Sequence, residues 1–242
     1  MRKWNKILLV VAALGVAAAL DACRPRHPEP TYKGHPLSYW VTRYGEYRGN
    51  HFVDLGPDPA AAEAISKIGT NALPFLLNWL RYERSEARRW AYSTLYYSLQ
   101  HAPKSIPSQQ LLAWADKPNR RAGFVPAAFK ALGPTALPAL PAIASIARDP
   151  TAPDPARRAQ YALRRIGPES VPFLIQVLQD TNALNRDQVT YSIGSFSNPQ
   201  RKDAIVAALT RHLLDEDIHV RFAVTNELSR IAHEALTYAP PP

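Results

Sequence analysis

One short phrase recurs along this chain at nearly constant spacing. It reads Gly-Thr-Asn-Ala-Leu-Pro at 69–74, Gly-Pro-Thr-Ala-Leu-Pro at 133–138 and Gly-Pro-Glu-Ser-Val-Pro at 167–172, with a weaker copy, Ala-Pro-Lys-Ser-Ile-Pro, at 102–107. The closing prolines are 33, 31 and 34 residues apart. A fixed period in this range is the signature of a repeat array, in which each unit packs on its neighbours. Such arrays usually serve as binding surfaces, and few are enzymes.

The residues around each phrase predict a pair of helices per repeat. In the fourth repeat, Gly167 is the residue type that ends a helix, and Pro168 fits the first turn of the next. Apolar residues keep the helical spacing on both sides of this turn: Ala159, Ala162, Leu163 and Ile166 before it, and Val171, Leu174, Ile175 and Leu178 after it. The first repeat carries the same second stripe at Leu73, Leu76, Leu77 and Leu80. The second repeat is degenerate, because Gln109 and Gln110 occupy stripe positions.

We therefore expect an all-α fold of about five to six helix pairs, with no β-sheet. The expected pairs are 59–68 with 72–82, 84–100 with 106–115, 120–132 with 135–147, 156–166 with 169–179, and 185–196 with 200–214. A helix near 218–235 should close the array. Residues 23–58 should form a tether and a capping segment with a helix near Pro36, and residues 237–242 a disordered tail.

The pattern Ala-x-x-x-Ile-Gly-x-x-Ala-Val-Pro-x-Leu resembles the short bacterial HEAT repeat, and the resemblance covers residues 59–236. It implies a HEAT-type α-solenoid in which the second helix of each pair lines the concave face. The Pro-Leu-Ser-Tyr-Trp block at 36–40, followed by Ile-Gly-Thr-Asn-Ala-Leu-Pro at 68–74, is also similar to exported HEAT-repeat proteins of environmental bacteria. That second similarity implies architecture without a known activity.

The N-terminal residues 1–22 have the pattern of an export signal. Basic residues precede Ile7–Leu20, an apolar run of 14 residues, which is shorter than the ~20 residues of a membrane-spanning helix. Leu20-Asp21-Ala22-Cys23 follows and resembles a bacterial lipobox, although Asp21 departs from the small residue usual there. We expect lipidation at Cys23, the only cysteine, and a periplasm-facing lipoprotein of the bacterial envelope. A secretory signal cleaved near Ala22 and an uncleaved anchor are the alternatives.

The chain is basic, with a formal net charge of +9, which favours anionic partners without selecting one. Arginine pairs fall near the starts of predicted first helices and could form an anion-binding ridge: Arg88, Arg89, Arg157 and Arg158. The simpler interpretation is a solvated face. In HEAT repeats an arginine placed like Arg158 often stacks against an acidic residue of the next repeat, and the resemblance implies such a pair here. We do not expect nucleic acid as a partner, because an exported protein would not meet it in the cytoplasm.

Patterns for catalysis are missing from the sequence. It contains no Gly-x-Ser-x-Gly, Walker A, His-Glu-x-x-His or Cys-x-x-Cys. Iron enzymes among HEAT-like proteins use several His-Glu pairs, whereas this chain has one, His233-Glu234. We therefore expect no catalytic residues, no metal site and no cofactor.

The second helices offer a candidate partner-binding surface. Aromatic and amide side chains there face away from the leucine stripe: Phe75, Asn78, Tyr82, Phe173 and Gln176. Exposed apolar groups beside amides suit protein or peptide recognition, although both rings could instead pack on neighbouring repeats. The other early aromatics are expected to be mostly core: Trp79, Trp90, Tyr92, Tyr96, Tyr97 and Trp114. The sequence thus favours a non-catalytic binding scaffold; a polyanion-binding solenoid (glycan or nucleic acid) or an enzyme accessory subunit is the alternative.

Overall fold

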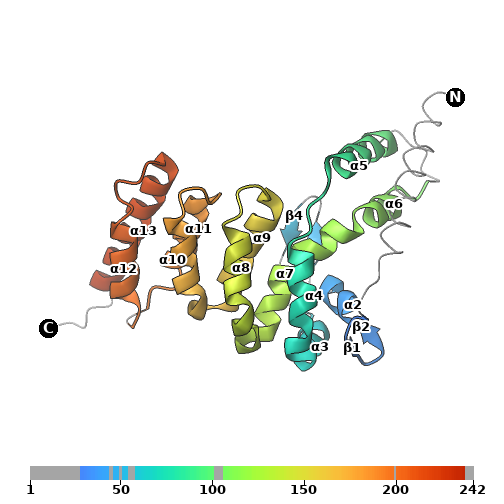
Figure 1. Cartoon of the computed structure of the whole chain (residues 1–242), viewed down its shortest axis with the longest axis horizontal. Coiled ribbons are helices and arrows are strands. Elements are labelled where there is room, and N and C mark those ends of the chain that lie inside the picture. Colours follow the sequence, from blue (N-terminus) through green and yellow to red (C-terminus); the bar gives the residue numbers. More distant parts are fainter. Residues whose placement is uncertain are drawn as a thin grey trace.

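The computed structural model describes residues 28–43, 46–48, 51–53, 58–100, 106–198 and 200–237. These residues form mainly helices, arranged as an elongated row with the N-terminal elements at one end and α13 at the other (Figure 1). The predicted signal peptide, Cys23 and residues 238–242 lie outside the described ranges, as do residues 102–105 of the weakest phrase.

The helices follow the chain in pairs, close to the predicted boundaries. Repeat one consists of α3 and α4, repeat two of α5 and α6, repeat three of α7 and α8, repeat four of α9 and α10, and repeat five of α11 and α12, before the single α13. Their bounds are α3 (Pro59–Ile68), α4 (Leu73–Leu80), α5 (Glu86–Leu99), α6 (Ser108–Ala115), α7 (Lys117–Leu132), α8 (Leu140–Ala147), α9 (Pro153–Ile166), α10 (Val171–Gln179), α11 (Arg186–Gly194), α12 (Lys202–Thr210) and α13 (Ile218–Thr237).

The repeated phrase forms the turn inside a pair. Gly69, Gly133 and Gly167 follow α3, α7 and α9 with φ values of +62°, +54° and +125°, a region in which glycine is the least strained residue. Short 3₁₀ segments then lead into the second helices: η1 (Gly69–Ala72), η2 (Gly133–Ala139) and η3 (Pro168–Ser170). The three described copies therefore confirm the predicted helix–turn–helix reading of the phrase.

The buried face of the second helices is turned slightly from the predicted stripe. Leu174 is fully buried, as expected, but Ile175 and its equivalent Leu77 are only half-buried. Val177 and Trp79 are buried instead. The reason is that α4 packs on α7, and α10 on both α8 and α11, so these helices bury the side that meets neighbouring repeats as well as the side that meets their own partner.

Repeat two does not stack between its neighbours. Helices α5 and α6 pack mainly on each other around Ala91, Leu95 and Leu99, which form a small cluster separate from the main core. Helix α4 contacts α7 and α9 instead, so repeat one lies directly on repeat three. Figure 1 shows α5 and α6 projecting beside the row.

Two short antiparallel hairpins precede α3, so the prediction of no β-sheet is wrong for this segment. Strands β1 (Thr31–Tyr32) and β2 (His35–Pro36) pair around Lys33 and Gly34, whose φ values of +48° and +78° suit a tight hairpin turn. Strands β3 (Glu46–Arg48) and β4 (His51–Val53) form the second hairpin. Both strand pairs are too short to show the alternating pattern by which strands are recognised in a sequence.

The capping helix expected near Pro36 is present as α2 (Leu37–Arg43). It buries Leu37, Trp40 and Val41 and packs on α3 and α7. The Trp40 indole Nε1 donates to the Tyr32 carbonyl, 3.2 Å away, which ties α2 to the first hairpin. This segment therefore covers the apolar end of repeat one, which an array needs at its terminal units.

Among the described residues, one helical stretch, Lys117–Ala147, passes a length and hydropathy test for a membrane span. It comprises α7, η2 and α8, and its large side chains Phe124, Phe129 and Ile143 are buried against other helices. Gly133 interrupts it with a positive φ. We therefore assign this stretch to the core of the row.

Candidate functional site

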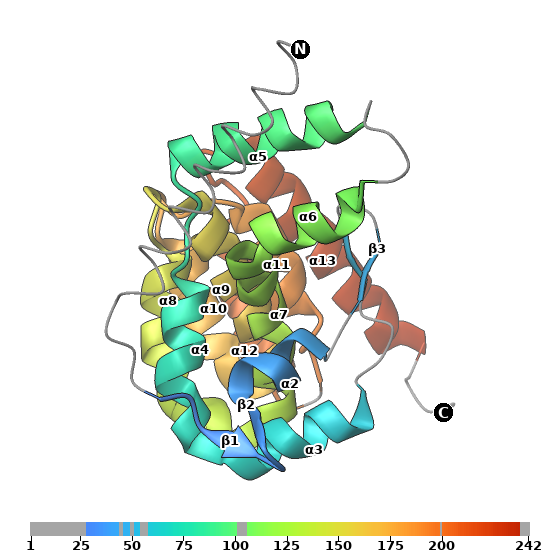
Figure 2. The same cartoon turned by 90° about the vertical axis from the view of Figure 1, so that its right-hand side faces the viewer.

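The predicted partner-binding residues lie on α4 and α10, and both helices occupy the same side of the row together with α8 (Figures 1 and 2). Phe75 and Phe173 are half-buried and pack partly on the core. Asn78 and Gln176, one turn further along each helix, are exposed. The structure thus repeats one combination, a partly open aromatic ring beside an open amide, at equivalent positions of repeats one and four.

Between these helices, α8 interrupts the aromatic pattern. Ala139 and Ala142 occupy the positions equivalent to Phe75 and Asn78. The exposed residues of this stretch are Pro138, Pro141 and Ser145. The face therefore has two aromatic–amide pairs separated by small side chains, and we call it the α4–α10 face.

Tyr82 lies just beyond α4 and contributes differently from the other four predicted residues. Its side chain is half-buried, and its carbonyl accepts a hydrogen bond from the Arg158 guanidinium. The Leu80 carbonyl accepts from the same nitrogen at 3.5 Å. Tyr82 therefore takes part in a contact between repeats through its backbone, in addition to any exposed surface that its ring offers.

Arg158 itself is only 7% exposed. Carbonyl groups at the C-terminal end of a helix lack intrahelical partners and carry partial negative charge, and the guanidinium satisfies two of them at the end of α4. The resemblance to HEAT repeats implied an acidic partner for this arginine, which stays a prediction; the Arg158 guanidinium donates to the backbone carbonyls of Leu80 and Tyr82. Arg158 therefore joins repeat four to repeat one and does not belong to an exposed basic face.

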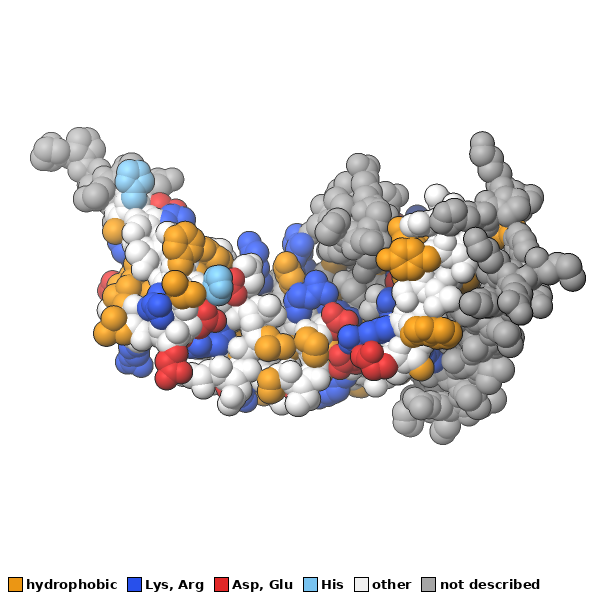
Figure 3. Space-filling view, turned by 90° about the horizontal axis from the view of Figure 1, so that it is seen from above, with side chains coloured by type: hydrophobic (Ala, Val, Ile, Leu, Met, Phe, Trp, Pro, Cys, Tyr) orange, Lys and Arg blue, Asp and Glu red, His pale blue; other side chains and the backbone are white. Residues whose placement is uncertain are grey.

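The other predicted anion-binding arginines lie nearer to solvent and close to carboxylates. Arg89 is exposed, with its guanidinium 3.0 Å from Glu83 and 3.8 Å from Glu86. Arg157 is 3.4 Å from Asp154, and Arg88 is half-buried. On the face seen in Figure 3, Lys and Arg side chains are interspersed with acidic ones along the row. The charges therefore alternate rather than gather into one continuous positive strip.

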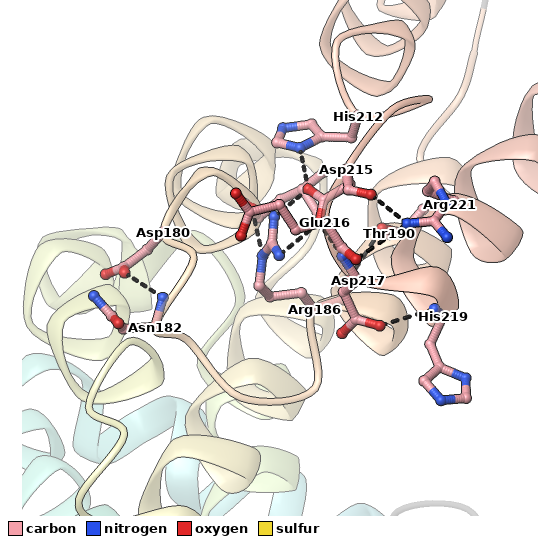
Figure 4. A network of polar contacts seen from close by, with 11 residues as sticks. Asp180, Asn182, Arg186, Thr190, His212, Asp215, Glu216, Asp217, His219 and Arg221 are labelled. Atoms are coloured by element: carbon pink, nitrogen blue, oxygen red, sulfur yellow. Dashed lines mark hydrogen bonds and ion pairs between the residues drawn. The ribbon is translucent and has the colours of Figure 1, made fainter.

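A buried ion pair joins the start of α11 to the segment between α12 and α13, and no predicted site residue belongs to it (Figure 4). Arg186 Nη1 donates to Asp215 at 2.9 Å, Nη2 also contacts this carboxylate, and Nε donates to the Leu178 carbonyl at 2.9 Å. His212 Nδ1 lies 2.9 Å from Asp215 Oδ2. The Arg221 guanidinium donates to the Asp215 carbonyl at 2.6 Å. The Arg186–Asp215 pair links α11 to the segment that precedes α13, and the Leu178 carbonyl ties the same arginine to repeat four.

The electrostatics of Asp215 follow from these contacts. Burial opposes its ionisation, but hydrogen bonds from Arg186, His212 and the Asp217 amide outweigh burial and lower its pKa to about 2. An aspartate beside a histidine also occurs in hydrolase triads. Here, however, the carboxylate is held by an arginine, and the nearby Thr190 hydroxyl donates to the Arg186 carbonyl at 3.1 Å. The cluster is therefore built as a joint between repeats.

The described residues contain no group of three or more His, Cys, Asp or Glu side chains placed to hold a metal ion. Cys23, the predicted lipidation site, lies outside the described ranges.

Several exposed aromatics were not anticipated from the sequence. Trp90, Tyr97 and Trp114 on α5 and α6 are 64%, 65% and 45% exposed, whereas aromatics of this region were expected to be mostly core. Trp79 is buried as expected. The sequence carried one sign of this exposure, since Gln109 and Gln110 occupy stripe positions on α6. A helix that lacks a second apolar face cannot be buried on both sides. A second exposed apolar group lies at the far end: Leu214, Ile218 and Phe222.

Comparison with known proteins assigns no family to this arrangement. No protein-family model matches the chain, and no curated protein and no solved structure gives a significant match. The resemblance of the repeated phrase to HEAT repeats therefore rests on the residues of the chain itself.

Proposed function

We propose that this protein is a HEAT-type α-solenoid of the bacterial envelope, lipid-anchored through Cys23, that binds a protein or peptide and has no catalytic activity. The architecture is supported by consecutive helix pairs and by the positive φ of the phrase glycines Gly69, Gly133 and Gly167. The export signal and the lipobox-like Leu20–Cys23 sequence support the location.

The observation that carries the binding proposal is the duplicated aromatic–amide pair on the α4–α10 face. Phe75 with Asn78 and Phe173 with Gln176 have matching burial in repeats one and four. A partly exposed ring that becomes desolvated on binding can act as an anchor worth about 2 kcal/mol or more. The neighbouring amides can pair with the backbone of a bound peptide, which gives a polar rim to each anchor.

The polyanion alternative draws on the net charge of +9 and on exposed Arg89 and Arg157. Both arginines already lie within 4 Å of carboxylates, and surface ion pairs of this kind add little specific affinity. Binding through them would be screened steeply by salt. The α4–α10 face is therefore the better supported surface.

The test compares partner capture from crosslinked native envelopes. The Phe75→Ala/Phe173→Ala variant should weaken capture by at least about 30-fold, the equivalent of losing one anchor of about 2 kcal/mol. Because both rings also touch the core, Asn78→Ala/Gln176→Ala serves as a milder variant at exposed positions. Circular dichroism and thermal unfolding establish that each variant is folded.

The matched control is Arg88→Ala/Arg89→Ala/Arg157→Ala, which should keep most of the capture at moderate salt. Loss of capture only in this arginine variant, together with steep salt dependence of the wild type, would reject the α4–α10 face and favour a polyanion.

A further inference from the structure

The α5–α6 hairpin exposes rings of a particular kind. Trp90 and Tyr97 are seven residues apart on α5, and this spacing places them on the same side of the helix. Both are about two-thirds exposed, and α6 adds Trp114. Figure 3 shows hydrophobic side chains open to solvent on this part of the molecule. Three large rings on one small projection form an unusual concentration of exposed apolar surface.

The chemistry of these rings fits the boundary between lipid and water. Tryptophan and tyrosine combine an apolar body with a hydrogen-bonding group, and they are enriched where a membrane meets solvent. The opposite end of the row exposes Leu214, Ile218 and Phe222 instead, none of which has a polar group on its side chain. Arg88 and Arg89 precede Trp90 on α5. Because Arg89 lies near Glu83 and Glu86, we expect the aromatic rings to contribute more to membrane binding than the arginine charges.

The chain enters the folded body through a firmly held point. The backbone amide of Leu37 donates to the Pro30 carbonyl at 2.9 Å, and that of Ser38 donates to the Glu29 carboxylate at 2.8 Å. Six residue steps separate Glu29 from Cys23, and they span at most about 22 Å when fully extended. A lipid on Cys23 would therefore keep this point of the body close to the membrane.

The entry point and the hairpin lie at the same end of the row. Figure 2 looks onto this end, where α2, β1, β2, α5 and α6 are in the foreground, and Figure 1 places α13 at the opposite end. The two ends of the hairpin are joined to each other, because Arg84, before α5, pairs with Asp116, after α6. The Arg84 guanidinium lies 4.7 Å from the ring centroid of Tyr92 on α5. These contacts close the base of the hairpin where the chain leaves the row and rejoins it.

We propose that the α5–α6 hairpin is a membrane-contact element whose Trp90, Tyr97 and Trp114 rings rest at the headgroup boundary of the membrane that holds Cys23. This inference rests on the lipid anchoring of the proposed function. It gives repeat two a role that differs from that of the stacked repeats. It also leaves the α4–α10 face, on helices of the row itself, available to a protein partner.

The experiment uses the full chain purified from membranes and reconstituted into vesicles of phosphatidylethanolamine and phosphatidylglycerol, with lipids brominated on their acyl chains near the headgroups. Bromine quenches tryptophan fluorescence only at close range. The wild type should be quenched, and Trp90→Phe/Trp114→Phe should lose most of that quenching. The matched control adds Phe222→Trp to this double variant, because Phe222 and Trp90 are both 64% exposed but lie at opposite ends. This new tryptophan should remain unquenched.

Equal lipid quenching in the wild type and in Trp90→Phe/Trp114→Phe would overturn the inference, as would quenching of the tryptophan at position 222. The inference would also be overturned if a bound protein, and not lipid, shielded Trp90 and Trp114 from solvent. Labelling of cells with an alkyne fatty acid tests the anchor separately by comparing the wild type with Cys23→Ala. Labelled Cys23 with unquenched rings rejects only the hairpin contact, whereas an unlabelled chain that does not float with vesicles rejects both. Partner capture by the α4–α10 face is measured independently of either result.

Discussion

Repeats four and two each contain a copy of the same phrase, yet repeat four is stacked in the row and repeat two projects beside it. In repeat four, α9 and α10 bury Leu163, Leu174 and Leu178 in the main core. In repeat two, α5 and α6 bury Ala91, Leu95 and Leu99 in a cluster of their own. The difference shows that a repeat needs two apolar faces to remain in the row, one for its partner helix and one for the next repeat.

The gap left by repeat two is closed by its neighbours. Helix α4 packs on α7, and α9 reaches the end of α4 through Arg158. Repeat one is thereby joined to repeats three and four. Repeat two projects from the row as an insertion between repeats one and three. A long insertion of this kind costs little in chain entropy, because the penalty for closing a loop grows slowly with its length.

The largest expected effect comes from truncating a buried leucine in each of the two repeats. Leu174→Ala should lower the free energy of unfolding of the row by about 2–5 kcal/mol, because it leaves a cavity in a shared core. Leu95→Ala should mainly destabilise α5 and α6, since Leu95 belongs to the separate cluster. Denaturant unfolding measures the first effect, and amide hydrogen exchange resolved by helix measures the second.

A loss of protection confined to α5 and α6 in Leu95→Ala would support the comparison. Equal losses throughout the row in both variants would show that repeat two is coupled to the core, contrary to the packing described.

The next effect concerns the ion pair between α11 and the segment that follows α12. Asp215 has a folded-state pKa of about 2, below its ordinary value of 3.8. Its ionised form therefore stabilises the fold by about 2–3 kcal/mol above pH 4, and this contribution is lost as the pH falls from about 4 to about 2. Asp215→Asn should have a free energy of unfolding about 2–3 kcal/mol below that of the wild type at pH 7. This difference should shrink as the pH falls from about 4 to about 2. Urea unfolding of both proteins at several pH values measures it, and a pH-independent difference would contradict the assignment.

The smallest expected effect tests whether Arg158 joins repeat four to repeat one. Arg158→Met keeps a long apolar stem but removes the donor to the carbonyls of Leu80 and Tyr82. Leaving buried carbonyls unpaired should cost about 1–3 kcal/mol. The adjacent control, Arg157→Met, changes an exposed residue and should stay within about 0.5 kcal/mol of the wild type. Thermal unfolding compares the two, and equal effects would mean that Arg158 does not join the repeats.

The candidate site was predictable in position and only partly in exposure. The spacing of Phe75 and Phe173 places both rings on the side of the second helix away from Leu76 and Leu174, and it left open whether they face solvent or neighbouring repeats. In the structure each ring is half-buried: one part is open to solvent and another packs against the main core. For Trp90 and Tyr97 the expectation of core packing was wrong, because their exposure depends on whether repeat two is stacked.

The sequence by itself determined the local elements: the helix pairs, the glycine turns at 69, 133 and 167, and the burial of residues such as Leu174. These follow from periodicity and backbone conformation within about one repeat, which are local properties. The tertiary structure decided which repeats touch, which side of α4 is buried, and that Arg158 meets backbone carbonyls. Those outcomes depend on competition among distant apolar faces for the same neighbours, so no single stretch of residues contains them.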